Sequence, residues 1–286
     1  MPRHSTLQLV QKAARENYAV PAINIIDPLS MRAVMEAADK LKTPLIVQTS
    51  VKTVRLFGAK TLVSAFEDAL SGIAVPITLH LDHCPDRAVI TEAIVAGWDS
   101  VLFDASNRDF DTAIAETREV VAEAHAANVE VESEIENIVG VEDGVGSDTA
   151  VHAYSVEQLV ASAEDCRVDL LAPALGTSHG VYSSQPALLP ERSAEIAART
   201  DIPIVLHGGT GLSNEEFQAF VDAGVGKINV STALKHSYMK SALTYLQDVA
   251  APQDKWEPVN LFATQVEACE GTVREFATIF GSIGKA

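Results

Sequence analysis

Three histidines stand where they could act together as metal ligands. His83, His179 and His207 each come at the end of a short apolar run, or just after it, in the segments LHLDH, GTSHG and VLHGGTG. Three imidazoles that leave one coordination position open form a catalytic zinc site. A hydrogen bond at a loop entrance explains any one of these histidines equally well. All three in the same setting predict a bound Zn2+.

Acidic side chains follow the same pattern. Asp82 directly precedes the first of these histidines, Asp104 ends the run VLFD, and Glu132 and Glu134 lie in VESE. In a barrel of parallel strands, catalytic groups gather where the strands end and the following loops begin. We therefore expect these carboxylates near the histidines. His80 alternates with Asp82 and is predicted to lie inside the barrel or behind a ligand.

Two glycine- and hydroxyl-rich segments indicate a phosphate site. GGTG occupies residues 208–211 and NVST occupies residues 229–232, each after an apolar run. Loops after the seventh and eighth strands are the usual phosphate-binding place in such barrels. Glycines let backbone N–H groups approach an anion, and a helix N-terminus adds partial positive charge. Alternatively, Ser231 or Thr232 caps the following helix.

The apolar runs alternate with stretches of helical character. The predicted strands are residues 19–25, 44–49, 76–82, 100–104, 129–134, 170–174, 203–207 and 227–230. Between them, stretches such as 29–41, 62–70, 111–127 and 156–164 have apolar residues at helical spacing. Eight strand–helix units predict a single α/β domain over residues 1–286, a closed (β/α)8 TIM barrel. Residues 135–153 are expected to be irregular, and residues 232–249 and 258–280 to form additional C-terminal helices joined by a connector at 251–257.

The bulk composition excludes several classes of partner. The net charge of the 286 residues is −18, which disfavours nucleic acid because phosphate neutralisation requires clustered Lys and Arg. The acidic surface disfavours anionic membranes, and no apolar run approaches the length of a membrane span. The N-terminal segment lacks the apolar core of a signal peptide. A soluble, cytoplasmic protein is expected.

The chain resembles the class II ketose-bisphosphate aldolases, which include the fructose- and tagatose-bisphosphate aldolases. The resemblance runs from AVPAINI through LHLDH, ESEIENIVGVEDG, GTSHGVY, LHGGTG and KINVST to FGSIGKA. It implies reversible aldol cleavage of a phosphorylated ketose to an aldehyde and a ketone like dihydroxyacetone phosphate (DHAP). It also implies a homodimer or homotetramer. Breaking a carbon–carbon bond beside a carbonyl leaves negative charge, which a Zn2+ stabilises as a Lewis acid.

The resemblance also assigns roles to particular residues. Asp82 would exchange a proton with the aldehyde-derived oxygen, and Glu142 would handle the proton at the enediolate carbon. Metal positions match His83, His179 and His207 for the catalytic zinc, and Asp104 and Glu134 for a second or displaced metal. Substrate-binding positions match Asn24, Ser50, Gly180, Gly208, Gly209, Thr210, Asn229, Ser231 and Thr232. A monovalent cation, Na+ or K+, belongs near Gly180, Gly208 and Thr210.

Departures from the family pattern fall near the phosphate region. Ser183, Ser184 and Gln185 stand where the family often has a lysine, and Ala233 stands where it usually has Asp or Glu. Lys52 would supply positive charge lost elsewhere. These differences leave the metal-binding and acid–base residues intact, but they mean that the resemblance does not identify which sugar phosphate is the substrate.

Two other functions are weighed against an aldolase. A zinc-dependent barrel hydrolase usually places an H-x-H pair on its first strand, and residues 19–25 contain no histidine. A non-catalytic barrel that acts as a binding or regulatory subunit would be expected to have lost part of the site, whereas Asp82, Glu142 and the three histidines are all present. The content of bound zinc distinguishes the scaffold from the enzymes.

Overall fold

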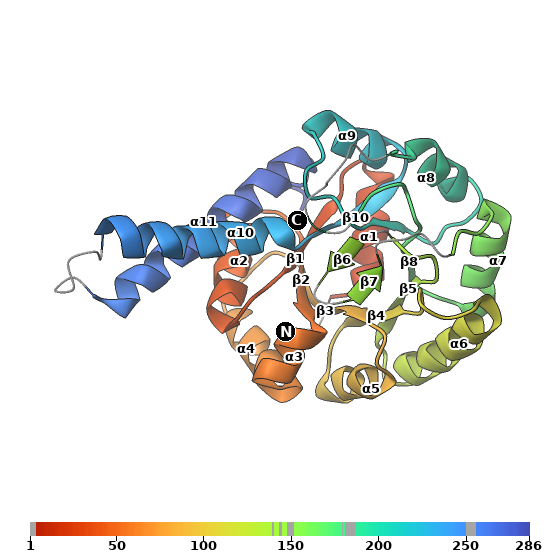
Figure 1. Cartoon of the computed structure of the whole chain (residues 1–286), viewed down its shortest axis with the longest axis horizontal. Coiled ribbons are helices and arrows are strands. Elements are labelled where there is room, and N and C mark those ends of the chain that lie inside the picture. The colour runs from red at the N-terminus through yellow and green to blue at the C-terminus, as the bar shows by residue number, and fades with distance from the viewer. Residues whose placement is uncertain are drawn as a thin grey trace.

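The centre of the molecule is a closed barrel of parallel strands (Figure 1). The computed structural model describes residues 4–138, 140–142, 145–147, 152–178, 180, 187–249 and 256–286, with the backbone alone at 140–142 and 145–147. Around the barrel the strands are β1 (Val20–Asn24), β10 (Val225–Val230), β9 (Ile204–Leu206), β8 (Leu170–Leu171), β5 (Glu130–Glu134), β4 (Ser100–Asp104), β3 (Ile77–Cys84) and β2 (Leu45–Ser50). This arrangement confirms the predicted (β/α)8 barrel.

A ring of helices covers the outside of the barrel (Figure 1). Its members are α2 (Pro28–Leu41), α3 (Val51–Phe57), α4 (Ala59–Ala69), α5 (Arg87–Ala96), α6 (Phe110–Ala126), α7 (Val156–Cys166), α8 (Pro190–Ala197) and α9 (Asn214–Asp222). Side-chain caps fix several helix starts: Asp27, Ser155 and Ser213 each form a capping box. The larger hydrophobic core lies between the strands and these helices.

Helix α1 (Thr6–Arg15) closes the N-terminal end of the barrel. Its residues Leu9, Val10 and Ala13 belong to a second, smaller core together with barrel residues of β1, β2, β4, β8 and β9. The helix approaches β10 so closely that a Cβ on Gly226 would lie 2.5 Å from the backbone oxygen of Val10. A ligand must therefore enter from the opposite end, where the strands finish, which we call the barrel mouth.

Two long C-terminal helices project from the barrel as an arm (Figure 1). Helix α10 (Thr232–Thr244) continues into a π-helical turn (Tyr245–Val249), and α11 (Pro258–Ile279) packs along α10 and α2. The predicted terminal helices are thus present, while residues 251–255 of the expected connector lie outside the described residues. No helix in the described part of the chain is both long enough and apolar enough to cross a membrane.

The segment 135–153, expected to be irregular, contains a small antiparallel pair. Its strands are β6 (Gly140–Glu142) and β7 (Val145–Ser147), with Gly140 opposite Ser147. Three-residue strands are too short to show a clear alternation of apolar and polar residues, and the GVEDGVGS sequence reads as turn-forming. The sequence therefore indicated a loop where the backbone pairs briefly with itself.

Candidate active site

The end of β3 is distorted so that Asp82 and His83 both reach the barrel mouth. Neighbouring residues of a regular strand point to opposite faces. Here the pairing of β3 with β4 shifts between Leu81 and Cys84, and His83 has a φ of 40°, which non-glycine residues rarely adopt. As a result, the ligand atoms of Asp82, His83 and His207 lie within 4.8 Å of one another. Such strain costs about 1–3 kcal/mol and is typical of functional sites.

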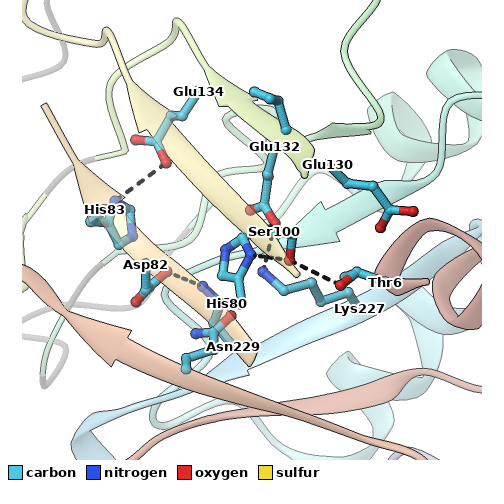
Figure 2. Close-up of polar contacts among 12 residues, drawn as sticks. Thr6, His80, Asp82, His83, Ser100, Glu130, Glu132, Glu134, Lys227 and Asn229 are labelled. Atoms are coloured by element: carbon cyan, nitrogen blue, oxygen red, sulfur yellow. Dashed lines mark hydrogen bonds and ion pairs between the residues drawn. The ribbon is translucent and has the colours of Figure 1, made fainter. Parts of the chain in front are cut away.

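Amide donors from the two strands β1 and β10 hold the carboxylate of Asp82. Asn24 Nδ2 donates to Oδ2 at 2.8 Å, and Asn229 Nδ2 donates to Oδ1 at 3.1 Å. Gln48 Nε2 in turn donates to Asn24 Oδ1 at 2.6 Å. All four side chains are buried. Asp82 is therefore fixed in position by neutral donors (Figure 2).

Two histidines and two further carboxylates meet beside Asp82. His83 Nδ1 lies 3.3 Å from Asp104 Oδ2 and 3.7 Å from Glu134 Oε2, and His207 Nδ1 lies 3.0 Å from the same Glu134 oxygen. The rings of His83 and His207 meet edge-on with centroids 4.7 Å apart. Nitrogen and carboxylate ligands at these separations suit Zn2+. The structure thus brings together four of the five predicted metal ligands.

The mouth cluster carries an excess of buried negative charge. Burial by itself lowers the pKa of His83, but the carboxylates of Asp82, Glu134 and Asp104 overcome it and raise this pKa well above its ordinary value. Burial and the charge of Asp104 raise the pKa of Glu134 well above its usual range. Burial opposes ionisation of Asp104, yet His83 and Ser106 lower its pKa to about 2. Among the described residues, no lysine or arginine contacts these three carboxylates, so the cluster is suited to a cation.

Two predicted site residues lie beyond what the structure describes in detail. His179 is outside the described residues, and for Glu142 the structure gives only the backbone, in β6. The described residues on either side of His179 meet, because Leu189 N donates to Leu175 O and a Cβ on Gly176 would lie 1.9 Å from the backbone oxygen of Ala187. The roles of His179 and Glu142 stay predictions.

The glycines after β9 are required by close packing. Gly208 has a φ of 67°, and a Cβ there would lie 2.6 Å from the backbone oxygen of Ser178. A Cβ on Gly209 would lie 2.8 Å from the ring of Phe217 in α9. A side chain at Gly209 would therefore disturb helix packing and would not point at an anion, so substitution of Gly209 is a poor test of phosphate binding. Thr210, next in the chain, is partly exposed.

Ser231 is positioned as a helix cap but does not act as one. It precedes α10, yet its side chain makes no capping hydrogen bond. Ser231 Oγ and Asn229 Oδ1 are buried and have no hydrogen-bond partner in the described part of the structure, whereas Thr232 is partly exposed at the start of the helix. Buried polar atoms are normally paired. Of the two readings of this segment, Ser231 fits a ligand-binding role better than a capping role.

A cavity of about 420 Å3 lies between α3 and α10 at the mouth. Ser50, Lys52, Lys235 and Tyr238 are among the residues that line it, together with apolar side chains. Ser50 also caps α3, since its hydroxyl accepts a hydrogen bond from Thr53 N at 3.2 Å. The cavity thus combines an apolar wall with two cationic side chains from different elements.

Below the mouth lies a second group of buried polar residues. Glu132 lies near the histidines and His80 lies inside the barrel, as predicted, whereas Lys227 was not predicted to belong to the site. Glu132 accepts from Lys227 Nζ at 2.6 Å and lies 2.8 Å from His207 Nε2, and all three side chains are fully buried. His80 Nδ1 lies 2.8 Å from Ser100 Oγ, and burial and the charge of Lys227 lower the pKa of His80 well below its ordinary value. The presence of Lys227 in the otherwise apolar strand sequence VGKINV was the one sequence feature that could have indicated this group. Figure 2 shows the side chain of Lys227 beside Glu132.

The fold and this site define a (β/α)8 barrel whose mouth is built from histidines and carboxylates. The sequence model of the class II fructose-bisphosphate aldolases matches residues 4–285, and the chain belongs to this family. The protein is therefore an aldolase, a lyase, and the barrel hydrolase and the non-catalytic scaffold are set aside.

Relatives match over nearly their whole length. The chain is 36% identical over 282 residues to a 6-phospho-5-dehydro-2-deoxy-D-gluconate aldolase of Bacillus velezensis, covering 97% of this chain and 95% of that one. It is 34% identical over 287 residues to a fructose-bisphosphate aldolase of Geobacillus stearothermophilus, covering 99% and 98%. A putative fructose-1,6-biphosphate aldolase of Coccidioides immitis has a similar structure, with a TM-score of 0.89, 27% identity, and coverage of 98% and 97%.

Proposed function

We propose that this protein is a zinc-dependent class II aldolase that reversibly cleaves a phosphorylated ketose into a DHAP-like ketone and an aldehyde. The observation that carries the proposal is the buried cluster of His83, His207, Asp104 and Glu134, with Asp82 beside it and no lysine or arginine in contact with its carboxylates among the described residues. Family membership supports aldol chemistry, and the donor atoms support a divalent metal.

The donor set fits Zn2+. His83 and His207 would hold the catalytic ion with His179 as the third histidine, and Asp104 and Glu134 would serve a second or displaced position. Zn2+ bound there would stabilise, as a Lewis acid, the negative charge that develops when the carbon–carbon bond breaks. The alternative of a lysine Schiff base gains no support from Lys227, which is buried in an ion pair with Glu132.

Two carboxylates would carry the proton transfers. Asp82, held by Asn24 and Asn229, would give a proton to, or take it from, the aldehyde-derived oxygen. Glu142, in the segment between β5 and α7, would move the proton at the enediolate carbon. A rigid strand end suits the first role, and Glu142 ends strand β6 of that segment.

The phosphate of the DHAP half would bind between the two segments after β9 and β10. Gly208, Gly209 and Thr210 would provide backbone N–H groups on one side, and the start of helix α10, with Ser231 before it and Thr232 as its first residue, lies on the other. The buried hydroxyl of Ser231 supports this placement. We also propose that a monovalent cation, Na+ or K+, binds near Gly180 and Gly208.

The other end of the substrate would carry a second anion. The names of the two relatives describe substrates with a phosphate at one end and a second charged group at the other, a carboxylate in the deoxygluconate and a phosphate in the fructose bisphosphate. The cavity lined by Lys52 and Lys235 could neutralise either group. This cavity therefore supports a ketose phosphate with an anionic tail as the substrate class.

We further propose that the chain is a single domain that assembles into a homodimer or homotetramer in the cytoplasm. The arm exposes large apolar side chains, among them Met239, Leu243, Leu246, Val259 and Phe262. Contiguous exposed apolar surface is typical of interfaces. Light scattering coupled to size-exclusion chromatography measures the assembly, and a monomer would contradict this part of the proposal.

A panel of phosphorylated ketoses tests the substrate class. Each compound would be assayed for retro-aldol cleavage with and without a carboxylate or phosphate at the end remote from the DHAP half. We expect ketoses with the second anion to have the higher kcat/KM, and Lys52→Met to remove that preference while leaving the monoanionic ketoses unaffected. Equal turnover of both sets by the wild-type protein would contradict the second-anion proposal.

A further inference from the structure

Glu132 lies between a buried lysine and a histidine of the mouth. Its Oε2 accepts from Lys227 Nζ at 2.6 Å, and its Oε1 lies 2.8 Å from His207 Nε2. All three side chains are fully buried in the middle of the barrel. Figure 2 shows Lys227 reaching Glu132 from the β10 side, beneath the level of Glu134 and His83.

These contacts determine which nitrogen of His207 carries hydrogen. Glu132 accepts from the Lys227 ammonium group through Oε2, and its Oε1 is placed to accept a hydrogen bond from His207 as well. The nitrogen that faces Glu132, Nε2, must then be the N–H donor. The other nitrogen, Nδ1, faces the mouth, where it lies 3.0 Å from Glu134 Oε2.

We infer that the Lys227–Glu132 pair is a positioning device that fixes the ring and the tautomer of His207, so that the lone pair of Nδ1 is directed at the metal. This inference rests on the proposed zinc site and goes beyond it, because neither residue touches the metal or the substrate. Histidine ligands commonly donate their second N–H to a carboxylate, which orients the ring and raises its basicity.

The composition of this layer argues that the pair is more than a core-packing feature. The interior of such a barrel is usually filled by branched apolar side chains. A buried ion pair gains little over apolar residues of similar volume because desolvation opposes the attraction. Further buried polar groups lie below this pair: His80 Nε2 is 3.6 Å from Glu132 Oε2, beyond hydrogen-bond distance, and Ser100 links His80 to Thr6 of α1.

Glu132→Gln tests the inference, with Glu130→Gln as the matched control. The glutamine keeps the shape of the side chain but places an amide N–H2 against the Lys227 ammonium or against His207 Nε2. Glu130 lies two residues earlier on the same strand, and its contacts are Ser5 and Leu7 N of the α1 end of the barrel. The same substitution there leaves His207 untouched.

Zn2+ affinity is the first readout, measured by competition with a chromophoric chelator. We expect Glu132→Gln to weaken Zn2+ binding by about 10- to 100-fold and Glu130→Gln to leave it unchanged. Adding Lys227→Met to Glu132→Gln should recover part of the loss, because the amide then meets no ammonium group. This double variant also serves if the single variant folds poorly. Wild-type affinity in a folded Glu132→Gln or double variant would overturn the inference.

The tautomer of His207 is the second readout, and it needs no activity. Long-range 1H–15N correlations on protein labelled with 15N-histidine report which ring nitrogen is protonated, and His207→Asn identifies the signals. We expect a proton on Nε2 in the wild-type protein, with or without Zn2+ at pH 9, and loss of that fixed tautomer in Glu132→Gln. A proton fixed on Nδ1 would overturn the inference. Failure of the wild-type protein to bind Zn2+ would instead refute the proposed zinc site, and the tautomer would still decide the role of Glu132.

Discussion

Glu132 and Glu134 lie two residues apart on β5 and occupy very different surroundings. Glu132 faces the ammonium group of Lys227 and one nitrogen each of His207 and His80, so its charge is matched within the barrel. Glu134 faces two histidines and shares its layer with the carboxylates of Asp82 and Asp104. Both are buried. In the lower layer, the negative charge of Glu132 is balanced by Lys227. In the layer at the mouth, the carboxylates of Asp82, Asp104 and Glu134 need a bound cation to balance their charge.

This difference shows how one strand can serve both the fold and the site. Alternation along β5 places Glu130, Glu132 and Glu134 at three depths of the same barrel (Figure 2). The lowest binds the start of α1, the middle one supports His207, and the uppermost faces the proposed metal. The positive φ of His83 adds backbone strain to the uppermost of these depths.

The largest expected effect on activity comes from replacing Asp82, the proposed general acid–base residue at the barrel mouth. We expect Asp82→Ala to lower the rate of carbon–carbon cleavage by about 10²–10⁴-fold, which is the usual contribution of general acid–base catalysis. Exchange of solvent deuterium into DHAP should persist, because that step does not use the aldehyde oxygen. Steady-state kinetics and mass spectrometry of DHAP measure the two reactions separately.

The complementary substitution is Glu142→Ala, which should suppress deuterium exchange into DHAP. This contrast assigns the two carboxylates to different protons of one reaction. Exchange at the wild-type rate in Glu142→Ala would show that the assignment of this base is wrong. Loss of both reactions in Asp82→Ala would indicate a supporting role for Asp82 rather than proton transfer.

Lys227→Met should mainly affect stability. The substitution leaves the carboxylate of Glu132 buried without its ammonium partner, and breaking a buried pair in this way costs about 3–5 kcal/mol. Urea unfolding of the EDTA-treated protein measures the change. Lys60→Met is the control, because Lys60 is exposed on α4 and should change the free energy of unfolding by less than about 0.5 kcal/mol. An equal effect of the two substitutions would mean that the lower layer is not held together by this pair.

Glu134→Gln should raise the free energy of unfolding of the EDTA-treated protein, whereas Lys227→Met should lower it. The Glu134→Gln substitution removes one of three clustered carboxylates that no lysine or arginine contacts in the described part of the structure, so we expect the EDTA-treated protein to gain about 1 kcal/mol of stability. The gain should disappear or reverse when Zn2+ is present. If Glu134→Gln destabilises the metal-free protein as Lys227→Met does, the two layers do not differ in the proposed way.

The smallest expected effect concerns Glu130 at the closed end of the barrel. Burial raises the pKa of Glu130, despite hydrogen bonds from Ser5 and Leu7 N that lower it. A raised folded-state pKa means that the folded protein holds this proton more strongly. The resulting stability is present below the unfolded pKa of about 4.3 and is lost as pH rises through the folded value. The stability of the wild type relative to Glu130→Gln should therefore fall as pH rises above about 4.3, which thermal unfolding at several pH values measures.

The sequence predicted the barrel better than it predicted the contacts inside it. Each apolar run gave a strand, because a buried parallel strand needs only a short block of apolar residues between breaks. Asp82, Asp104, Glu134 and His207 were found from their places at strand ends, since these ends meet at one side of a barrel. The strain at His83 left no such signal, because a shift of pairing depends on the neighbouring strand.

The contacts across the barrel could not be predicted from the sequence, because they also depend on neighbouring strands that are distant in the chain. The Lys227–Glu132 pair joins β10 to β5, whose residues are 95 positions apart, and only the closed shape of the barrel brings them together. Gly209 was predicted to lie at the anion site, which stays a prediction, and the packing of Phe217 against it is a tertiary feature that no local pattern encodes. The short β6–β7 pair was missed because its strands are too brief for periodicity to appear.

The central claim is that the mouth cluster holds a zinc ion on which the aldol cleavage depends. Metal analysis and cleavage assays on the same samples, before EDTA treatment, after it and after addition of Zn2+, test this claim most directly. We predict that zinc content and activity fall together and return together. Full activity in a sample without metal, or a covalent lysine–substrate adduct trapped by borohydride, would contradict it.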